Sequence, residues 1–439
     1  MTPRPAAVPV LFQCIHATAA ALSWPFLYLY YRLRIATDGK YGGNYRQRMG
    51  IDLPKRNSAR APLIWVHALS VGETLSAVPL VQALKEERPE AGIVFSGATE
   101  AGLEIARKRL ASWVDMFFCL PHDFPWTAGL LVRRLKPGLF VLVETDLWPG
   151  LLASLKRHGA ATALVNARLS PGSFRRLNRL KPLVGLVVDS FDVVFAQSLE
   201  DRLRFEALGV RPERSVCEGN LKFDSALLSA ADADPSGLRR SGGIEEGRPA
   251  WIAGSTHGGG EEEQILRVHK ALRVEHPDLL LILAQRDILR SEQIASLCRR
   301  FDLPVAVRSS GESACGKAVY LLDTMGELGA FYATADAAFI GGSMVPFGGH
   351  NPLEAVIRGT PTAWGPHLFN FREMEAILLG APCCSRIETR EELLEVMKGW
   401  LAQRGKSGAG KETVRDFIQP HLGASRRIAR RLSRAFALR

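Results

Sequence analysis

Short apolar runs alternate with helical segments along most of the chain. Because these runs are apolar on both faces, and helical segments such as residues 77–87 separate some of them, they predict strands of parallel sheets covered by helices. The predicted strands are Leu63–Val66, Ile93–Phe95, Leu139–Val143, Ala163–Val165 and Val193–Phe195, then Trp251–Ala253, Leu279–Leu283, Val319–Leu322, Ala337–Ile340 and Thr360–Trp364. The pattern predicts an α/β protein with two doubly wound, Rossmann-like domains facing a cleft.

A break in this pattern divides the chain. Residues 235–249 are rich in Gly, Ser, Arg and Glu, and we interpret them as a linker. The two α/β domains then comprise residues 41–234 and 250–424. Residues 1–40 and 425–439 flank them as terminal segments.

The N-terminal segment predicts a membrane contact. Val8–Tyr31 carries no charge, and its length suits a membrane-spanning or deeply inserted helix of roughly 20 residues. Arg32, Arg34 and Lys40 follow, which places this flank and the rest of the chain in the cytoplasm by the positive-inside rule. A cleaved signal peptide and a buried core helix kinked at Pro25 are the alternatives.

Composition narrows the class of protein. The chain has 439 residues and a net charge of +11, which favours an anionic partner: nucleic acid, an acidic membrane surface or phosphorylated substrates. No recognised nucleic-acid motif accompanies this charge. The seven cysteines are scattered and contain no CxxC pair, so we expect reduced thiols, no disulfide framework and no metal.

The C-terminal segment 425–439 is basic and partly amphipathic. Ile428, Leu432, Ala435 and Phe436 would share one helical face. Such a helix could lie on anionic lipid headgroups or pack on the protein as a solvated terminal helix.

The glycine-rich stretch Gly341–Glu354 has the strongest local signal for a ligand. It follows a predicted strand and leads into a helix, so backbone N–H groups and the helix N-terminus could hold a phosphate. Asn351 suits the N-cap, Pro352 the first helical position and Glu354 the third. A capped turn without a ligand is the alternative. Gly254–Glu261 forms a similar turn.

Other polar residues follow predicted strands of the first domain. Glu73 would lie at a helix start, where it could act as a general base or simply favour the helix dipole. Glu144 and Asp146 come directly after a buried strand. Arg168 could hold a carboxylate or phosphate, or pair with Asp146.

Six blocks in one order carry a resemblance to a known family. They are WVHALSVGET (Trp65–Thr74), VETDLWP (Val143–Pro149), NARLS (Asn166–Ser170), GNLKFD (Gly219–Asp224), DTMGEL (Asp323–Leu328) and GGSMVPFGGHNPLE (Gly341–Glu354). Together they resemble the 3-deoxy-D-manno-octulosonic acid (Kdo) transferases, glycosyltransferase family 30. The resemblance implies a GT-B fold, a CMP-Kdo donor, and transfer with inversion to a lipid A precursor (lipid IV-A) in lipopolysaccharide assembly at the cytoplasmic face of the inner membrane.

The resemblance also implies residue roles. Glu73 matches the general base, and Glu144 and Lys222 match residues that stabilise the transition state. The first domain would bind the acceptor, and the second would bind the nucleotide sugar. The donor-binding positions that it implies are Gln285, Arg286, Met325, Gly326, Glu327, Asn351, Pro352, Leu353 and Glu354, with Ser255 and Gly349 beside them. No cofactor is implied.

The chain departs from the family pattern at three places. Gly258 and Gly260 stand where the family usually has glutamates, Gln285-Arg286-Asp287 replaces Pro-Arg-His, and Phe347 replaces an arginine. These departures affect the expected contacts to the donor phosphate and base. A related GT-B transferase that uses a UDP-sugar is the alternative function. A third possibility is a basic membrane-surface protein that binds lipopolysaccharide precursors without turnover.

Overall fold

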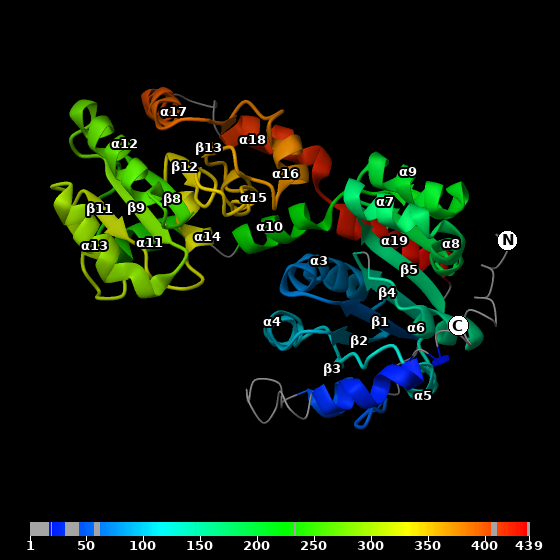
Figure 1. The fold of residues 1–439 in the computed structure, drawn as a ribbon. Helices are drawn as coiled ribbons and strands as arrows, with labels where there is room; N and C mark the ends of the chain where they lie inside the picture. The colour runs from blue at the N-terminus through cyan, green and yellow to red at the C-terminus, as the bar shows by residue number, and fades with distance from the viewer. Residues whose placement is uncertain are drawn as a thin grey trace. The chain divides into compact units, whose positions relative to one another are not determined.

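The computed structural model divides the chain into two compact units. It describes residues 17–18, 20–30, 44–56, 62–144, 146–231, 234–404 and 411–436. The first unit extends to Ser225 and resumes at His421, and the second unit is Ala226–Pro420 (Figure 1).

The first unit is built on one parallel sheet of seven strands. Their order is β3-β2-β1-β4-β5-β6-β7. The strands are β1 (Leu63–Ala68), β2 (Gly92–Gly97), β3 (Met116–Cys119), β4 (Leu139–Val143), β5 (Ala161–Ala167), β6 (Val193–Ala196) and β7 (Ser215–Cys217). The helices are α2 (Tyr45–Arg48), α3 (Val71–Glu87), α4 (Glu100–Leu110), α5 (Pro125–Leu135), α6 (Pro149–Arg157), α7 (Pro171–Arg179), α8 (Lys181–Val188), α9 (Leu199–Leu208) and α19 (Ala424–Ala435), with α10 (Leu221–Ala231) beginning here.

Both faces of this sheet are covered, as the apolar runs require. Successive side chains of a strand point to opposite faces. On β1, Ile64 and Val66 join a core cluster that includes residues of α3, α4 and α19. Leu63 and Trp65 join the other cluster, with residues of α5, α6, α8 and α9. The helices on the two faces make this unit doubly wound.

The second unit repeats this architecture with a seven-stranded parallel sheet in the order β10-β11-β9-β8-β12-β13-β14. Its strands are β8 (Ala250–Thr256), β9 (Leu280–Gln285), β10 (Val305–Val307), β11 (Val319–Leu321), β12 (Ala337–Ile340), β13 (Thr362–Trp364) and β14 (Cys384–Arg386). Its helices are α11 (Pro235–Ser241), α12 (Glu261–Glu275), α13 (Ser291–Arg300), α14 (Leu328–Phe331), α15 (Leu353–Val356), α16 (Arg372–Leu378), α17 (Arg390–Ala402) and α18 (Lys411–Ile418).

All ten predicted strands are present, and four further strands were not predicted. The additional strands are β3, β7, β10 and β14, which are the two edges of each sheet. They have three or four residues and are only partly buried. β7 and β14 contain polar residues, whereas β3 (MFFC) and β10 (VAV) are short apolar runs that the sequence analysis did not assign.

Two segment assignments differ from the sequence analysis. Residues 235–249 contain helix α11 and lie inside the second unit, so they are not a linker between domains. The C-terminal segment does not stand apart either: α19 returns to the first unit and packs on α3, as Figure 1 shows in red.

The N-terminal anchor is not confirmed. Residues 20–30 are helical, whereas residues 8–16, 19 and 31 of the predicted span lie outside the described residues. Among the described residues, no helix combines the length and the apolar character that crossing a bilayer requires.

Candidate active site

A cavity of about 510 Å³ in the first unit collects polar side chains from the carboxyl ends of β1, β4 and β5. In an open parallel sheet, ligands bind at this edge. The cavity is lined by Glu73, Glu144, Asp146, Arg168, Leu169, Ser170, Ser173, Arg176 and Leu177.

Glu73 lies in the first turn of α3, just after β1. Ser70 is the N-cap, and its hydroxyl accepts a hydrogen bond from the Glu73 amide at 3.3 Å. In return, the Glu73 carboxylate accepts hydrogen bonds from the amide of Leu69 at 2.6 Å and from the Ser70 hydroxyl at 3.0 Å. This reciprocal capping box holds the side chain in one position.

The environment of Glu73 makes its carboxylate a stronger base. Burial raises the pKa of Glu73, and the negative charges of Glu144 and Asp146 raise it further. A raised pKa improves a general base that works near neutral pH. The capping role and the base role are therefore compatible at this residue.

Glu144 follows β4 directly and has a left-handed backbone, with φ at 62°. This conformation is uncommon for a residue with a side chain, and such strain gathers at functional sites. One carboxylate oxygen, Oε1, lies 3.5 Å from Nζ of Lys222, the second residue of α10. The structure therefore pairs two of the three predicted catalytic residues.

Asp146 adds a third carboxyl group to the cavity. Burial raises the pKa of Asp146, and the charge of Glu144 adds to this effect. Asp146 and Arg168 both line this cavity. The sequence analysis considered these two residues as a possible pair.

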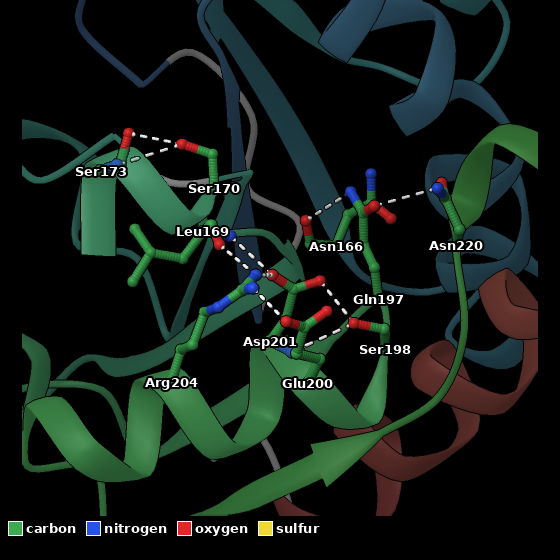
Figure 2. Close-up of polar contacts among 10 residues, drawn as sticks. All are labelled: Asn166, Leu169, Ser170, Ser173, Gln197, Ser198, Glu200, Asp201, Arg204 and Asn220. Carbon is green, nitrogen blue, oxygen red and sulfur yellow. Dashed lines mark hydrogen bonds and ion pairs between the residues drawn. The ribbon is translucent and has the colours of Figure 1, made fainter. Parts of the chain in front are cut away.

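Three amide side chains hold the start of α10, which carries Lys222. Figure 2 shows Asn166, Gln197 and Asn220 in this chain of hydrogen bonds. Gln197 donates to the carbonyl of Asn166 at 3.0 Å, and Asn220 donates to the amide oxygen of Gln197 at 2.9 Å. The Asn166 Oδ1 accepts from the Leu221 amide at 3.0 Å. Asn166 also has a positive φ of 55°.

The loop after β5 is held in a similar way. The amide of Leu169 donates to Asp201 at 2.8 Å, and Arg204 donates to the carbonyl of Leu169 at 2.7 Å (Figure 2). Ser170 then caps α7 by accepting from the Ser173 amide at 3.1 Å. These contacts place Ser173 and Arg176 at the cavity wall.

In the second unit, the first part of the glycine-rich turn already holds an internal anion. The buried carboxylate of Glu261 accepts hydrogen bonds from the amides of Gly342 at 2.8 Å, Ser343 at 3.1 Å and Met344 at 3.1 Å. It also accepts one from the His257 amide at 2.8 Å. These three N–H groups of the predicted phosphate-binding stretch are therefore not available to a phosphate, because Glu261 uses them.

The end of the glycine-rich stretch also differs in detail. Helix α15 begins at Leu353, with Pro352 at the N-cap, so Glu354 is the second helical residue rather than the third. Asn351 precedes the cap, and its Oδ1 accepts from the Leu353 amide at 3.1 Å. Gly349 has φ at 67°, which requires glycine-like freedom.

This turn contacts the end of β8 closely. Ser255 has φ at 58°. A Cβ atom at Gly341 would lie 2.5 Å from the carbonyl oxygen of Ser255, so only glycine allows this approach. The structure therefore brings the Ser255 turn and the Gly341–Glu354 stretch together.

Arg286 provides positive charge beside these two turns. Its exposed side chain makes no ion pair with the residues that the structure describes. Its charge helps to lower the pKa of His257 and of His350, which burial already lowers, to about 4 for His350. It also opposes the rise that burial causes in the pKa of Glu354.

An aromatic stack lies in the same region. The His257 ring stacks on Phe347, with centroids 4.4 Å apart, and on His350, with centroids 5.2 Å apart. The Nε2 atoms of the two histidines are 2.9 Å apart, so one ring donates a hydrogen bond to the other. Phe347 is 54% exposed and could contact a ligand.

Of the remaining residues predicted to bind the donor, some are bonded to other residues of the second unit and others are exposed. Gln285 is buried and donates to the Ser291 hydroxyl at 2.8 Å, while its Oε1 has no hydrogen-bond partner among the described residues. Glu327 forms an ion pair with Arg308 at 2.8 Å, so this carboxylate is engaged within the unit. Met325 is exposed, and Gly326 has φ at 87°.

Comparison with known proteins identifies the family. A family model for 3-deoxy-D-manno-octulosonic-acid transferase (kdotransferase) matches residues 43–225. A 3-deoxy-D-manno-octulosonic acid transferase of Haemophilus influenzae is 33% identical over 80% of this chain and 82% of the relative. The Bordetella pertussis enzyme of the same name is 34% identical over 85% of this chain and 88% of the relative. The chain belongs to the 3-deoxy-D-manno-octulosonic acid transferase family.

The Kdo transferase family is one of glycosyltransferases, which excludes the purely binding protein considered from the sequence. Solved structures add the fold. The UDP-GlcNAc 2-epimerase of Neisseria meningitidis aligns with a TM-score of 0.60 at 12% identity, over 85% of this chain and all of that chain. At this identity the likeness shows a shared GT-B-like fold and nothing about substrates.

Several residues of this Kdo transferase's candidate site are not apparent from its sequence. Glu261 looks like an ordinary first-turn glutamate of α12, and Arg176 like one of several arginines on an exposed helix. The capping box at Glu73 is the exception, since Ser70 precedes it by three residues.

Proposed function

We propose that this protein transfers Kdo from CMP-Kdo to a lipid A precursor, lipid IV-A, with inversion at the anomeric carbon. Its membership of the Kdo transferase family supports the reaction class. The observation that carries the mechanism is the single cavity that holds Glu73 and Glu144, with Lys222 paired to Glu144.

In this mechanism Glu73 accepts the proton of the acceptor hydroxyl as that oxygen attacks the anomeric carbon of Kdo. The cap bonds from Leu69 and Ser70 orient the carboxylate, and each of its oxygens retains a further lone pair. The bond to CMP breaks on the opposite side. One base and no covalent intermediate give inversion.

The pair Glu144–Lys222 stabilises charge in the transition state. An oxocarbenium-like centre develops positive charge as the phosphate departs, and a fixed carboxylate beside it is favourable. Lys222 compensates the charge of Glu144 before the substrate binds. The strained backbone of Glu144 and the amide chain from Asn166 to Asn220 hold the pair in place.

The second unit binds the donor nucleotide. Arg286, which has no ion pair among the described residues, contacts the phosphate of CMP. The exposed ring of Phe347 offers a contact to the base or ribose. Gln285 precedes Arg286 and belongs to the same proposed segment. Ser255, Gly349 and the segments Met325–Glu327 and Asn351–Glu354 surround them in the proposed donor site.

The protein acts at the inner membrane, with both α/β units on the cytoplasmic side. The uncharged stretch Val8–Tyr31 and the basic residues that follow it support this location. The lipid acceptor requires a membrane surface, and the net charge of +11 favours anionic lipids.

The test measures CMP release from CMP-Kdo in the presence of lipid IV-A. Glu73→Gln separates the two roles of this residue, because glutamine completes a capping box but is no base. We expect kcat to fall by at least roughly a hundredfold, with little change in melting temperature.

The chain contains a matched control residue for the Glu73→Gln variant. Glu392 forms the same kind of capping box on α17: its amide donates to Thr389 at 3.2 Å, and its carboxylate accepts from the Glu388 amide at 2.7 Å. Glu392→Gln should leave kcat unchanged. Full activity in Glu73→Gln would show that Glu73 is only a cap. An inactive wild type that turns over a UDP-sugar would contradict the donor.

A further inference from the structure

A second cavity in the first unit, of about 820 Å³, lies along the edge strand β7 and helix α19. It shares no lining residue with the cavity of Glu73. Five arginines line it: Arg214, Arg427, Arg430, Arg431 and Arg434. We call it the α19 groove.

Helix α19 cannot insert its apolar face into a membrane, because that face is part of the protein core. Ile428 and Leu432 are fully buried and belong to the same core cluster as residues of α3. The alternative in which the C-terminal helix packs on the protein is therefore the one the structure shows. The exposed arginines of α19 remain available on its other side.

The carboxylates of the groove do not neutralise all of these arginines. Glu218 forms ion pairs with Arg427 at 3.0 Å and with Arg431 at 2.5 Å. Arg430 has one exposed contact, to Glu87 at 3.4 Å, which contributes little. Arg434 makes no ion pair within the part of the chain that the structure describes.

The other two acidic residues of the groove do not change this balance. Asp192 forms an ion pair with Lys156. Arg214 pairs with Asp189 at 3.4 Å, which leaves the three lining carboxylates of Asp192, Glu213 and Glu218 against the four arginines of α19. The groove therefore has an excess of positive charge, to which Arg430 and Arg434 contribute most, because neither pairs with a carboxylate of the groove.

Apolar side chains form another part of the same wall. Val193, Val216 and Phe436 line the groove and are only partly buried against the core. A free phosphate would use the arginines and leave this apolar surface in water. An anionic amphiphile would use both, since its headgroup binds the guanidinium groups while its chain covers the apolar side chains.

We propose that the α19 groove binds one anionic phospholipid, with its phosphate on Arg430 and Arg434 and the start of an acyl chain along Val216 and Phe436. This site is separate from the acceptor and donor sites. The proposal rests on the groove itself and does not require the proposed transfer reaction.

The test uses the full chain and a short-chain lipid below its critical micelle concentration, so that general membrane attachment does not contribute. Calorimetric titration with dioctanoyl phosphatidylglycerol should show one binding site. The double variant Arg430→Gln/Arg434→Gln should bind at least about tenfold more weakly, because two charge-assisted contacts are lost.

The control variant, Arg300→Gln/Arg426→Gln, removes the same charge from exposed arginines that do not line the groove, and should bind like the wild type. If the control variant bound the lipid as weakly as the groove variant, the proposed site would be overturned, because binding would then depend only on the net charge of the protein. Equal binding of dioctanoyl phosphatidylcholine would overturn the anionic headgroup. Equal binding of glycerol phosphate would show an anion site without a lipid and overturn the occupant. Comparison of melting temperatures confirms that each variant is folded.

Discussion

Nζ of Lys222 lies 3.5 Å from Oε1 of Glu144, which joins the start of α10 to the end of β4. The two side chains are 32% and 21% exposed, so water screens the pair, and we expect it to contribute at most about 1 kcal/mol to stability. We propose a role in catalysis instead, because Glu144 lines the cavity that contains Glu73.

Replacing Lys222 by methionine should therefore affect rate more than stability. We expect Lys222→Met to lower kcat by roughly a hundredfold, the scale of one lost electrostatic contact in a transition state, with a small change in melting temperature. Lys270→Met is the control, because Lys270 pairs with Asp302 at 3.1 Å on the surface. A rise in KM with kcat unchanged would show that Lys222 only binds substrate.

The acidic limb of the pH–rate profile should report Glu73. Because burial raises the pKa of Glu73, its basic form is lost at a higher pH than for an exposed glutamate, and kcat/KM should fall as pH falls through that raised value. Asp146→Asn removes a neighbouring negative charge, so the limb should move to lower pH. The same substitution at the exposed Asp302 should leave it in place. If the acidic limb did not move in the Asp146→Asn variant, a group other than Glu73 would control it.

Arg286 should hold the donor phosphate. We expect Arg286→Gln to weaken CMP binding by about tenfold or more, measured by calorimetry, because a charge-assisted contact is lost. Loss of this positive charge should also raise the pKa of His350 from about 4, which NMR titration can follow. Arg300→Gln should change neither quantity. A shifted His350 with unchanged CMP affinity would place the phosphate elsewhere.

Glu261 should be essential for the structure of the second unit. Glutamine offers one acceptor oxygen where the carboxylate offers two, so at least one of the four amide donors would face an NH2 group. We expect Glu261→Gln to lower the free energy of unfolding by roughly 2–4 kcal/mol, from the unsatisfied buried donors. Glu263→Gln, at an exposed position of α12, should be neutral. Equal stability of the two variants in denaturant titration would contradict this role.

Part of the fold follows from local sequence alone. The central strands of both sheets are buried on both faces, so nearly every residue must be apolar, as in Leu139–Val143. The edge strands have a partner on one side only and tolerate polar residues, as in Ser215–Cys217. This explains why the ten interior strands were predicted and the edge strands β7 and β14 were not; the apolar edge strands β3 and β10 were missed without such a reason.

For the candidate site, too, the sequence determined one part and the tertiary structure decided another. The sequence alone determined the order of the motif blocks, and with it the family and the candidates Glu73, Glu144 and Lys222. Only the tertiary structure decided which groups meet. The amides of Gly342, Ser343 and Met344 bind Glu261 rather than a phosphate, because the start of α12 lies beside that turn. Likewise the arginines of α19 line a groove because β7 lies beside them. Contacts between residues far apart in the chain depend on how the sheets order their strands, and local pattern does not encode that order.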